Sequence, residues 1–98
     1  LKRLGKSNPS YLSFPMPGWT LSIDLAANSK QVETTLNEID IEIAKIGGKL
    51  YLAKDARQSK DIFKKTYKLI DNWKKQKKVL DPKEIFISDI ANRLKIFN

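Results

Sequence analysis

Hydrophobic and polar residues alternate strictly over residues 19–25, with the period of two that is typical of a half-buried β-strand. The apolar members of the pattern are Trp19, Leu21, Ile23 and Leu25. We expect these side chains to face a core, whereas the small polar residues between them face solvent or a ligand pocket. The pattern therefore predicts a strand over residues 19–25 with one buried face.

After residue 28 the apolar residues follow at steps of three and four, which indicates an amphipathic helix. Asn28 or Ser29 is suited to cap its start, with Gln31 three residues after Asn28 as in a capping box. Gly47 is suited to the left-handed position that ends a helix. The apolar stripe, which we expect to be buried, consists of Val32, Leu36, Ile39, Ile43 and Ile46.

The short apolar segment over residues 49–54 predicts a second strand, which completes a strand-helix-strand unit over residues 19–53. Two strands alone do not form a stable sheet. We therefore expect the sheet to be completed by further chain or by a second copy of the fragment in a homodimer. The predicted fold class is α+β.

The two flanking segments differ in character. Residues 1–18, with Pro9, Pro15 and Pro17, predict a loop whose apolar side chains lie against the rest of the chain. Residues 59–98 predict a helical tail that starts at Ser59 and is interrupted at Asp81-Pro82. Ser88 is placed to cap a last helix.

Composition narrows the chemistry. The 98 residues contain 19 Lys and Arg against 11 Asp and Glu, a net charge of +8, with no histidine and no cysteine. Catalytic triads with histidine, cysteine nucleophiles, disulfides and zinc sites with His or Cys ligands are therefore excluded within this chain. We expect no metal site.

The positive charge is concentrated in residues 54–78, which hold ten Lys and Arg against three Asp. Three interpretations stay open: a solvated lysine-rich helix, contact with an anionic membrane through residues 57–78, or binding of nucleic acid. Arg57 is the one arginine in the segment that can form a fork onto a phosphate. No helix-turn-helix, RNP or zinc-finger pattern is present, so nucleic acid is disfavoured. A basic module that binds anionic lipid or nucleic acid is the alternative function.

Four stretches of the sequence, which together cover residues 2–96, form a recognisable set. They are GGKLYLAKDAR at 47–57, LSFPMPGWT at 12–20 followed by Asp24, YKLIDNW at 67–73, and LDP at 80–82 running to FISDIANRL at 86–94. In order and spacing they resemble the C-terminal end of FAD-dependent oxidoreductases of the vanillyl-alcohol-oxidase type, most closely the decaprenylphosphoryl-ribose oxidase branch.

The resemblance implies that residues 1–98 are a single C-terminal fragment of a cap, or substrate, domain, and the missing initiating methionine agrees with a fragment. Its partner would be the N-terminal FAD-binding domain of the same protein, which is absent here. The parent would use FAD to oxidise a secondary hydroxyl of a sugar or lipid-linked sugar. We expect the fragment alone to bind no FAD and to be inactive, and the parent to be cytoplasmic, associated with the inner face of the membrane.

The resemblance also implies roles for five residues. Lys54 would be catalytic, near the flavin and the substrate, and Tyr51 would line the same pocket. Lys2, Thr20 and Ser22 match pocket-lining positions, although Ser22 stands where some members of the branch carry cysteine, which puts cysteine-directed inactivation in doubt. The ordinary alternatives are a surface Lys54 that pairs with Asp55 or meets solvent, a packing Tyr51, and plain surface positions for the other three.

One geometric difficulty concerns Tyr51 and Lys54, which are three residues apart. A regular strand would send their side chains to opposite faces. Both can face one pocket only if the strand ends or bulges near Ala53.

Overall fold

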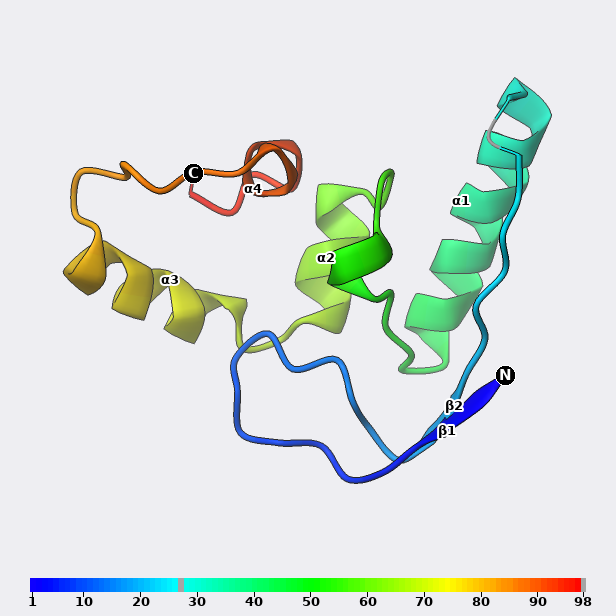
Figure 1. Cartoon of the computed structure of the whole chain (residues 1–98), viewed down its shortest axis with the longest axis horizontal. Helices are drawn as coiled ribbons and strands as arrows, with labels where there is room; N and C mark the ends of the chain where they lie inside the picture. The colour runs from blue at the N-terminus through cyan, green and yellow to red at the C-terminus, as the bar shows by residue number, and fades with distance from the viewer. Residues whose placement is uncertain (27, 98) are drawn as a thin grey trace.

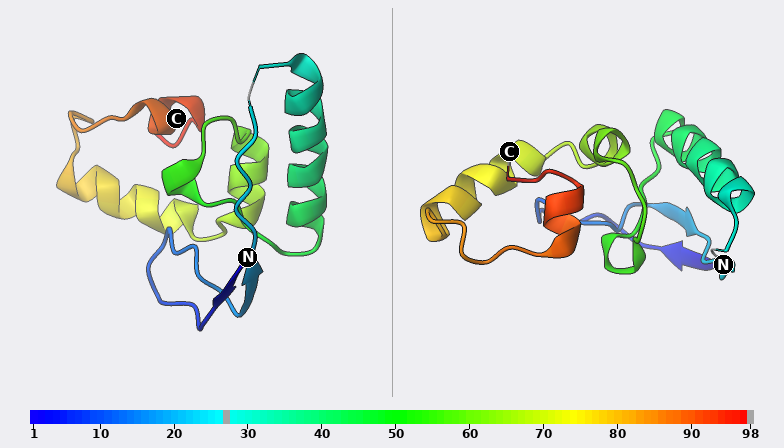
Figure 2. Two further views of the ribbon diagram at one scale, coloured as in Figure 1. Left: turned by 45° about the vertical axis from the view of Figure 1, so that its right-hand side comes forward. Right: turned by 90° about the horizontal axis from the view of Figure 1, so that it is seen from above.

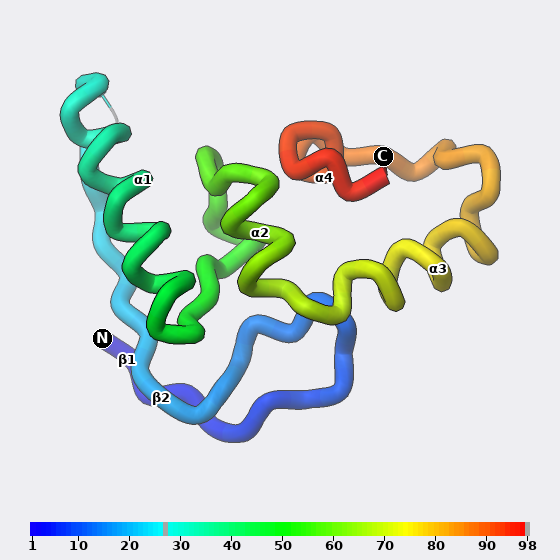
Figure 3. Tube along the Cα trace, turned by 180° about the vertical axis from the view of Figure 1, so that it is seen from behind, coloured from blue at the N-terminus to red at the C-terminus, as the bar shows by residue number. Residues whose placement is uncertain are grey.

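The computed structural model of the chain describes residues 1–26 and 28–97 and shows a mixed, mostly helical fold, which confirms the α+β class (Figure 1). The elements in chain order are β1 (Lys2–Leu4), β2 (Gly18–Thr20), α1 (Lys30–Lys45), the 3₁₀ helix η1 (Leu52–Lys54), α2 (Lys60–Thr66), α3 (Ile70–Leu80) and α4 (Asp89–Arg93). Helix α1 lies at one side of the molecule, α3 and α4 lie at the other, and α2 lies between them (Figures 1 and 3).

The sheet is a short antiparallel ribbon, in which Lys2 pairs with Thr20 and Leu4 with Gly18. The predicted strand over residues 19–25 is therefore wrong beyond Thr20. Its expected core face is wrong as well, because the four apolar side chains are exposed: Trp19 by 67%, Leu21 by 64%, Ile23 by 61% and Leu25 by 51%. Alternation produces burial only when a second layer covers one face, and the described part of the chain supplies no such layer.

Helix α1 begins and ends where the sequence predicts. The Ser29 hydroxyl accepts a hydrogen bond from the backbone N–H of Val32 at 3.3 Å, and Gly47 has a φ of 82°. Its buried face differs from the predicted stripe. Asp40 and Ala44 are buried, whereas Ile39 and Ile46 are exposed, because α1 packs against α2 through a face rotated by one residue.

The predicted strand over residues 49–54 is wrong, since this segment forms η1 instead. The backbone N–H of Lys54 donates to the carbonyl oxygen of Tyr51, and that of Asp55 donates to the carbonyl oxygen of Leu52, both at 3.2 Å. No strand of the described chain lies beside the segment. In addition, the Tyr67 hydroxyl donates to the carbonyl oxygen of Leu50 at 2.6 Å and so takes an acceptor that a sheet would use.

The hydrophobic core lies in the C-terminal half, where α2, α3, α4 and the last residues meet (Figure 2). Its buried members are Phe63, Tyr67, Ile70, Ala91, Leu94 and Ile96. Ser59 and Ser88 cap α2 and α4 as predicted, and α3 ends at Leu80, directly before Asp81-Pro82. The helical tail is thus confirmed, with a break between α2 and α3 that the sequence did not indicate.

The loop of residues 5–17 lies against this core, as its apolar residues predict. Leu12 packs on the buried cluster, and the ring of Phe14 lies 5.0 Å from the ring of Tyr51 between centroids. Within the described residues, no helix is both long enough and apolar enough to traverse a bilayer.

Candidate functional site

The turn around η1 carries the two predicted site residues Tyr51 and Lys54. A 3₁₀ helix has three residues per turn, so side chains at i and i+3 lie on the same side. The structure therefore removes the geometric difficulty by replacing the strand with a turn. Tyr51 is 49% exposed with one ring face tilted against Phe14, and Lys54 is exposed.

Asp55 holds this turn in place. Its carboxylate accepts hydrogen bonds from the backbone N–H groups of Arg57 at 3.1 Å and Gln58 at 2.8 Å, and from Nη2 of Arg93 at 2.7 Å. Arg93 also donates to the carbonyl oxygens of Gln58 and Asp55, which ties α4 to the end of η1. Asp55 thus pairs with Arg93, and no ion pair to Lys54 is found among the residues the structure describes.

The charge of Asp55 follows from these contacts. Burial alone would raise the pKa of its carboxyl group, but the hydrogen bond from Arg93 and those from the backbone N–H groups of Gln58 and Arg57 outweigh it. The pKa of Asp55 is therefore lowered from its ordinary value. The carboxylate stays ionised at neutral pH and supports the turn as an anion.

Tyr67 supports the same turn from behind. Its hydroxyl donates to Leu50, and its ring is buried. Burial, together with the nearby charge of Asp55, raises the pKa of Tyr67 to about 12. Because the hydroxyl keeps its proton throughout the physiological range, Tyr67 acts as a structural donor to the backbone.

Lys2 and Thr20 lie opposite each other in the β1–β2 ribbon, and Ser22 follows two residues later in an exposed position. The structure thus brings together two of these three predicted residues. The packing of Phe14 on Tyr51 connects the ribbon to the η1 turn, because Phe14 lies only four residues before Gly18, where β2 begins. Among the described residues, no direct hydrogen bond joins the two groups.

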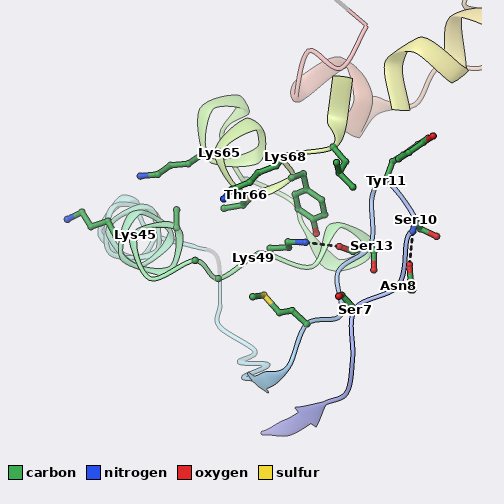
Figure 4. A pocket seen from close by; sticks show the side chains of 16 residues that line it. Ser7, Asn8, Ser10, Tyr11, Ser13, Lys45, Lys49, Lys65, Thr66 and Lys68 are labelled. Carbon is green, nitrogen blue, oxygen red and sulfur yellow. Dashed lines mark hydrogen bonds between the residues drawn. The ribbon is translucent and has the colours of Figure 1, made fainter. Parts of the chain in front are cut away.

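A basic hollow of about 520 Å³ lies between the N-terminal loop, the end of α1 and the end of α2 (Figure 4). Its four lysines are Lys45, Lys49, Lys65 and Lys68. Lys49 reaches across it and donates to the carbonyl oxygen of Ser13 at 3.0 Å, whereas Lys45 and Lys65 extend away from it in Figure 4. The lysines therefore do not converge on one point, and none of the five predicted site residues lines the hollow.

An apolar cleft of about 510 Å³ lies between η1, α3 and α4. Leu52 and Ala53 of η1 line one side, so the cleft runs directly behind the turn that carries Lys54. The ammonium group of Lys77 lies over the rings of Phe86 and Phe97, at 5.9 Å and 5.2 Å from their centroids. Its charge is balanced by an ion pair with Asp81.

Arg57, the arginine that the sequence offered for phosphate binding, is engaged within the chain. Its guanidinium group forms a fork onto Asp40, with Nη1–Oδ2 at 2.7 Å and Nη2–Oδ1 at 2.9 Å, and it donates to Asn37 and to the carbonyl oxygen of Leu36. Contact with an anion through Arg57 is therefore blocked in this structure. The sequence signal that was overlooked is the spacing of Leu36, Asp40 and Ala44, which places an acidic residue on one helical face with two apolar ones.

No protein-family model matches the chain. It is 39% identical over 94 residues to an uncharacterized protein in the mprA 5' region of Streptomyces coelicolor, covering 96% of this chain and 26% of that protein. It is 37% identical over 95 residues to decaprenylphosphoryl-beta-D-ribose oxidase of Mycolicibacterium smegmatis, covering 97% of this chain and 20% of that oxidase. The chain thus spans about a fifth to a quarter of the length of these curated relatives.

Proposed function

We propose that this chain is the C-terminal portion of a flavin-dependent oxidoreductase that oxidises a secondary hydroxyl of a sugar, in particular a lipid-linked phosphoribose. The observation that carries the proposal is the 37% identity with decaprenylphosphoryl-beta-D-ribose oxidase over 97% of the chain. The four motifs, spread from residue 12 to residue 94, agree with it. In this proposal the chain is part of a cap domain, and its partner is the N-terminal FAD-binding domain of the same protein.

The chemistry of the η1 turn fits a flavin. When bound, FAD would supply the acceptor for the hydride that leaves the carbinol carbon of the sugar. Lys54 is exposed and forms no ion pair among the described residues, so its ammonium group is available to a group that becomes negative. Lys54 is therefore the residue of this chain that would hold the cofactor, with Tyr51 beside it.

Each of the other residues has a role suited to its position. The Tyr51 hydroxyl donates to a sugar hydroxyl while Phe14 restricts its ring. The rigid connection of Asp55 to Arg93 keeps Lys54 at a fixed place, so its charge needs no reorganisation during the reaction. Lys2, Thr20 and Ser22 contribute polar groups from the ribbon and the residues after it to the same pocket.

The isolated chain is proposed to bind flavin weakly or not at all and to be inactive, because the N-terminal domain supplies the flavin site. The exposed apolar side chains of residues 19–25 support this division, since they lack a covering layer in the described chain. A purified chain that retained flavin through gel filtration would contradict this part of the proposal.

The decisive experiment replaces Lys54 in the full-length parent. We expect Lys54→Ala to slow flavin reduction by substrate about a hundredfold, since one preorganised charge contributes about 3 kcal/mol in the transition state. Lys54→Arg should not restore the rate, because the planar guanidinium is larger and spreads its charge. Rapid-mixing absorbance of the flavin measures both variants, and thermal unfolding shows that the fold is retained.

The matched control is Lys64→Ala, which removes an equally exposed lysine from α2. We expect it to leave flavin reduction within about twofold, since an exposed charge far from the flavin is screened by salt. A Lys54→Ala enzyme that reduces its flavin at the wild-type rate would return Lys54 to an ordinary surface lysine.

A further inference from the structure

The end of α3 and the loop after it form an exposed apolar tip. Five large hydrophobic side chains lie here within nine residues: Val79 is exposed by 76%, Leu80 by 82%, Ile85 by 71%, Phe86 by 79% and Ile87 by 47%. In all views the tip lies at an extremity of the molecule, on the side opposite the N-terminus and α1 (Figures 1 and 2). Apolar clusters of this kind on a surface mark an interaction site.

The tip is a built structure and not a frayed end. The buried carboxylate of Asp81 accepts hydrogen bonds from the backbone N–H groups of Ile85 and Phe86, both at 2.9 Å. Lys77, one helical turn earlier, forms an ion pair with the same carboxylate. This side-chain clip folds the loop back and leaves the apolar side chains pointing away from the core.

Lysines surround the tip. Lys74, Lys75, Lys78 and Lys83 lie within five residues of Val79, and the nearby acidic residue is Glu84, because the charges of Lys77 and Asp81 cancel. Asp89 follows at the start of α4. An apolar patch with a net positive rim is complementary to the surface of a bilayer that contains anionic phospholipids, where apolar side chains enter the interface and lysines meet phosphates.

From this combination we infer that the tip of residues 79–87 docks on an anionic phospholipid surface, with Leu80 and Phe86 entering the interface and Lys75 and Lys78 meeting the headgroups. This goes beyond the proposed function, because oxidation of a sugar hydroxyl requires nothing of this edge. It also moves the basic contact away from Arg57, which is engaged with Asp40.

The apolar cleft lies directly beside the tip, since Phe86 and Ile87 also line the cleft. Docking in this orientation brings the mouth of the cleft to the level of the lipid chains. The cleft runs from there to η1, so the tip would hold the Lys54 turn at a short, fixed height above the membrane.

Sedimentation of the chain with sucrose-loaded vesicles tests the inference. Vesicles of phosphatidylcholine with roughly one third phosphatidylglycerol should bind the chain, and pure phosphatidylcholine should bind it at least tenfold more weakly. Val79→Ser/Leu80→Ser should reduce binding to the anionic vesicles at least tenfold. Phe86→Ser serves as a second, independent variant, and circular dichroism verifies that each variant remains folded.

Two matched controls keep the test sharp. Ile39→Ser/Ile46→Ser removes two exposed apolar side chains from α1 and should change binding by less than about twofold. Lys75→Gln/Lys78→Gln should weaken binding more than tenfold, at about fivefold per lysine, whereas Lys64→Gln/Lys65→Gln on α2 should have a small effect.

Equal loss in the tip and α1 variants would overturn the inference, as would unchanged binding by the tip variants. Binding that follows total charge alone would overturn it as well. Sedimentation equilibrium tests the rival occupant: if the tip joins two copies of the chain, Val79→Ser/Leu80→Ser converts a dimer to a monomer, and the membrane assignment is wrong.

Discussion

The two halves of the molecule have almost equal shares of apolar residues but treat them differently. In residues 59–97, side chains such as Phe63, Tyr67 and Leu94 are buried to 1% exposure or less. In residues 19–46, Trp19, Ile23 and other large apolar side chains lie open to solvent. The difference indicates that the C-terminal half supplies its own core, whereas the N-terminal half presents a surface made for another layer.

The largest test of this comparison removes a core side chain. Leu94→Ala should lower the free energy of unfolding by about 3 kcal/mol, because it leaves a cavity in a fully buried cluster. Leu21→Ala, at an exposed position, should change it by less than about 0.5 kcal/mol. Urea unfolding followed by circular dichroism measures both. Equal losses would mean that the two halves share one core.

If Leu94→Ala unfolds the chain outright, Ile70→Val gives the same comparison on a smaller scale. It should cost about 1 kcal/mol at a position that is 5% exposed.

The second test compares two ion pairs. Arg93→Met leaves the carboxylate of Asp55 buried without its partner and should cost about 2 kcal/mol. Lys45→Met removes the exposed pair with Glu42 in the N-terminal half and should cost less than about 0.5 kcal/mol. Both are read from urea midpoints. A larger loss for Lys45→Met would reverse our view of where charge stabilises this fold.

The third test is pH. Asp55 and Asp81 both have folded-state pKa values below their ordinary value, about 2 for Asp81, whose carboxylate is held chiefly by the hydrogen bond from Lys77. Depressed carboxyl pKa values give stability that is complete above the unfolded pKa and is lost as pH falls through the folded value. The urea midpoint should therefore be insensitive to these groups from pH 7 to about 5, and decline from about 4 towards 2.

Asp81→Asn should make that decline shallower, because one of the two carboxylates no longer titrates. Glu42→Gln, in the exposed pair of α1, should leave its slope unchanged. A decline centred near pH 6 in the parent chain would show that other groups govern its acid stability.

The smallest test concerns the junction of the halves. Gly47 has a φ of 82°, so Gly47→Ala should cost about 1 kcal/mol of unfolding free energy. Gly5→Ala, where a Cβ atom would meet open space, should cost almost nothing. Thermal unfolding of the two variants resolves the difference. Identical unfolding temperatures would indicate that the end of α1 adapts without strain.

The sequence predicted the helix ends because capping is local chemistry. Ser29, Ser59 and Ser88 each accept a hydrogen bond from a backbone N–H three residues later, which requires nothing from distant chain. Strands depend on a partner, so the alternation over residues 19–25 and the segment 49–54 could not settle their structure alone. The same holds for burial of the face that they present.

The site divides in the same way. Tyr51 and Lys54 were found through a motif, although the 3₁₀ turn that puts them on one side was not foreseen. The pairing of Asp55 with Arg93 spans 38 residues and leaves no local pattern to detect. Long-range pairs of this kind are decided by how α4 packs, which a single sequence does not reveal.

The fork of Arg57 onto Asp40 has a consequence for motion. It fastens the middle of α1 to the start of the chain segment that leads into α2, while Gly47 and Gly48 form the flexible end of the same helix. When the fork opens, α1 is released as a unit, and its amide protons exchange with deuterium through this local event. Those of α2 wait for the core around Phe63 to unfold. Native-state exchange would thus separate the two helices into slow and fast groups, and protease cleavage would begin in α1.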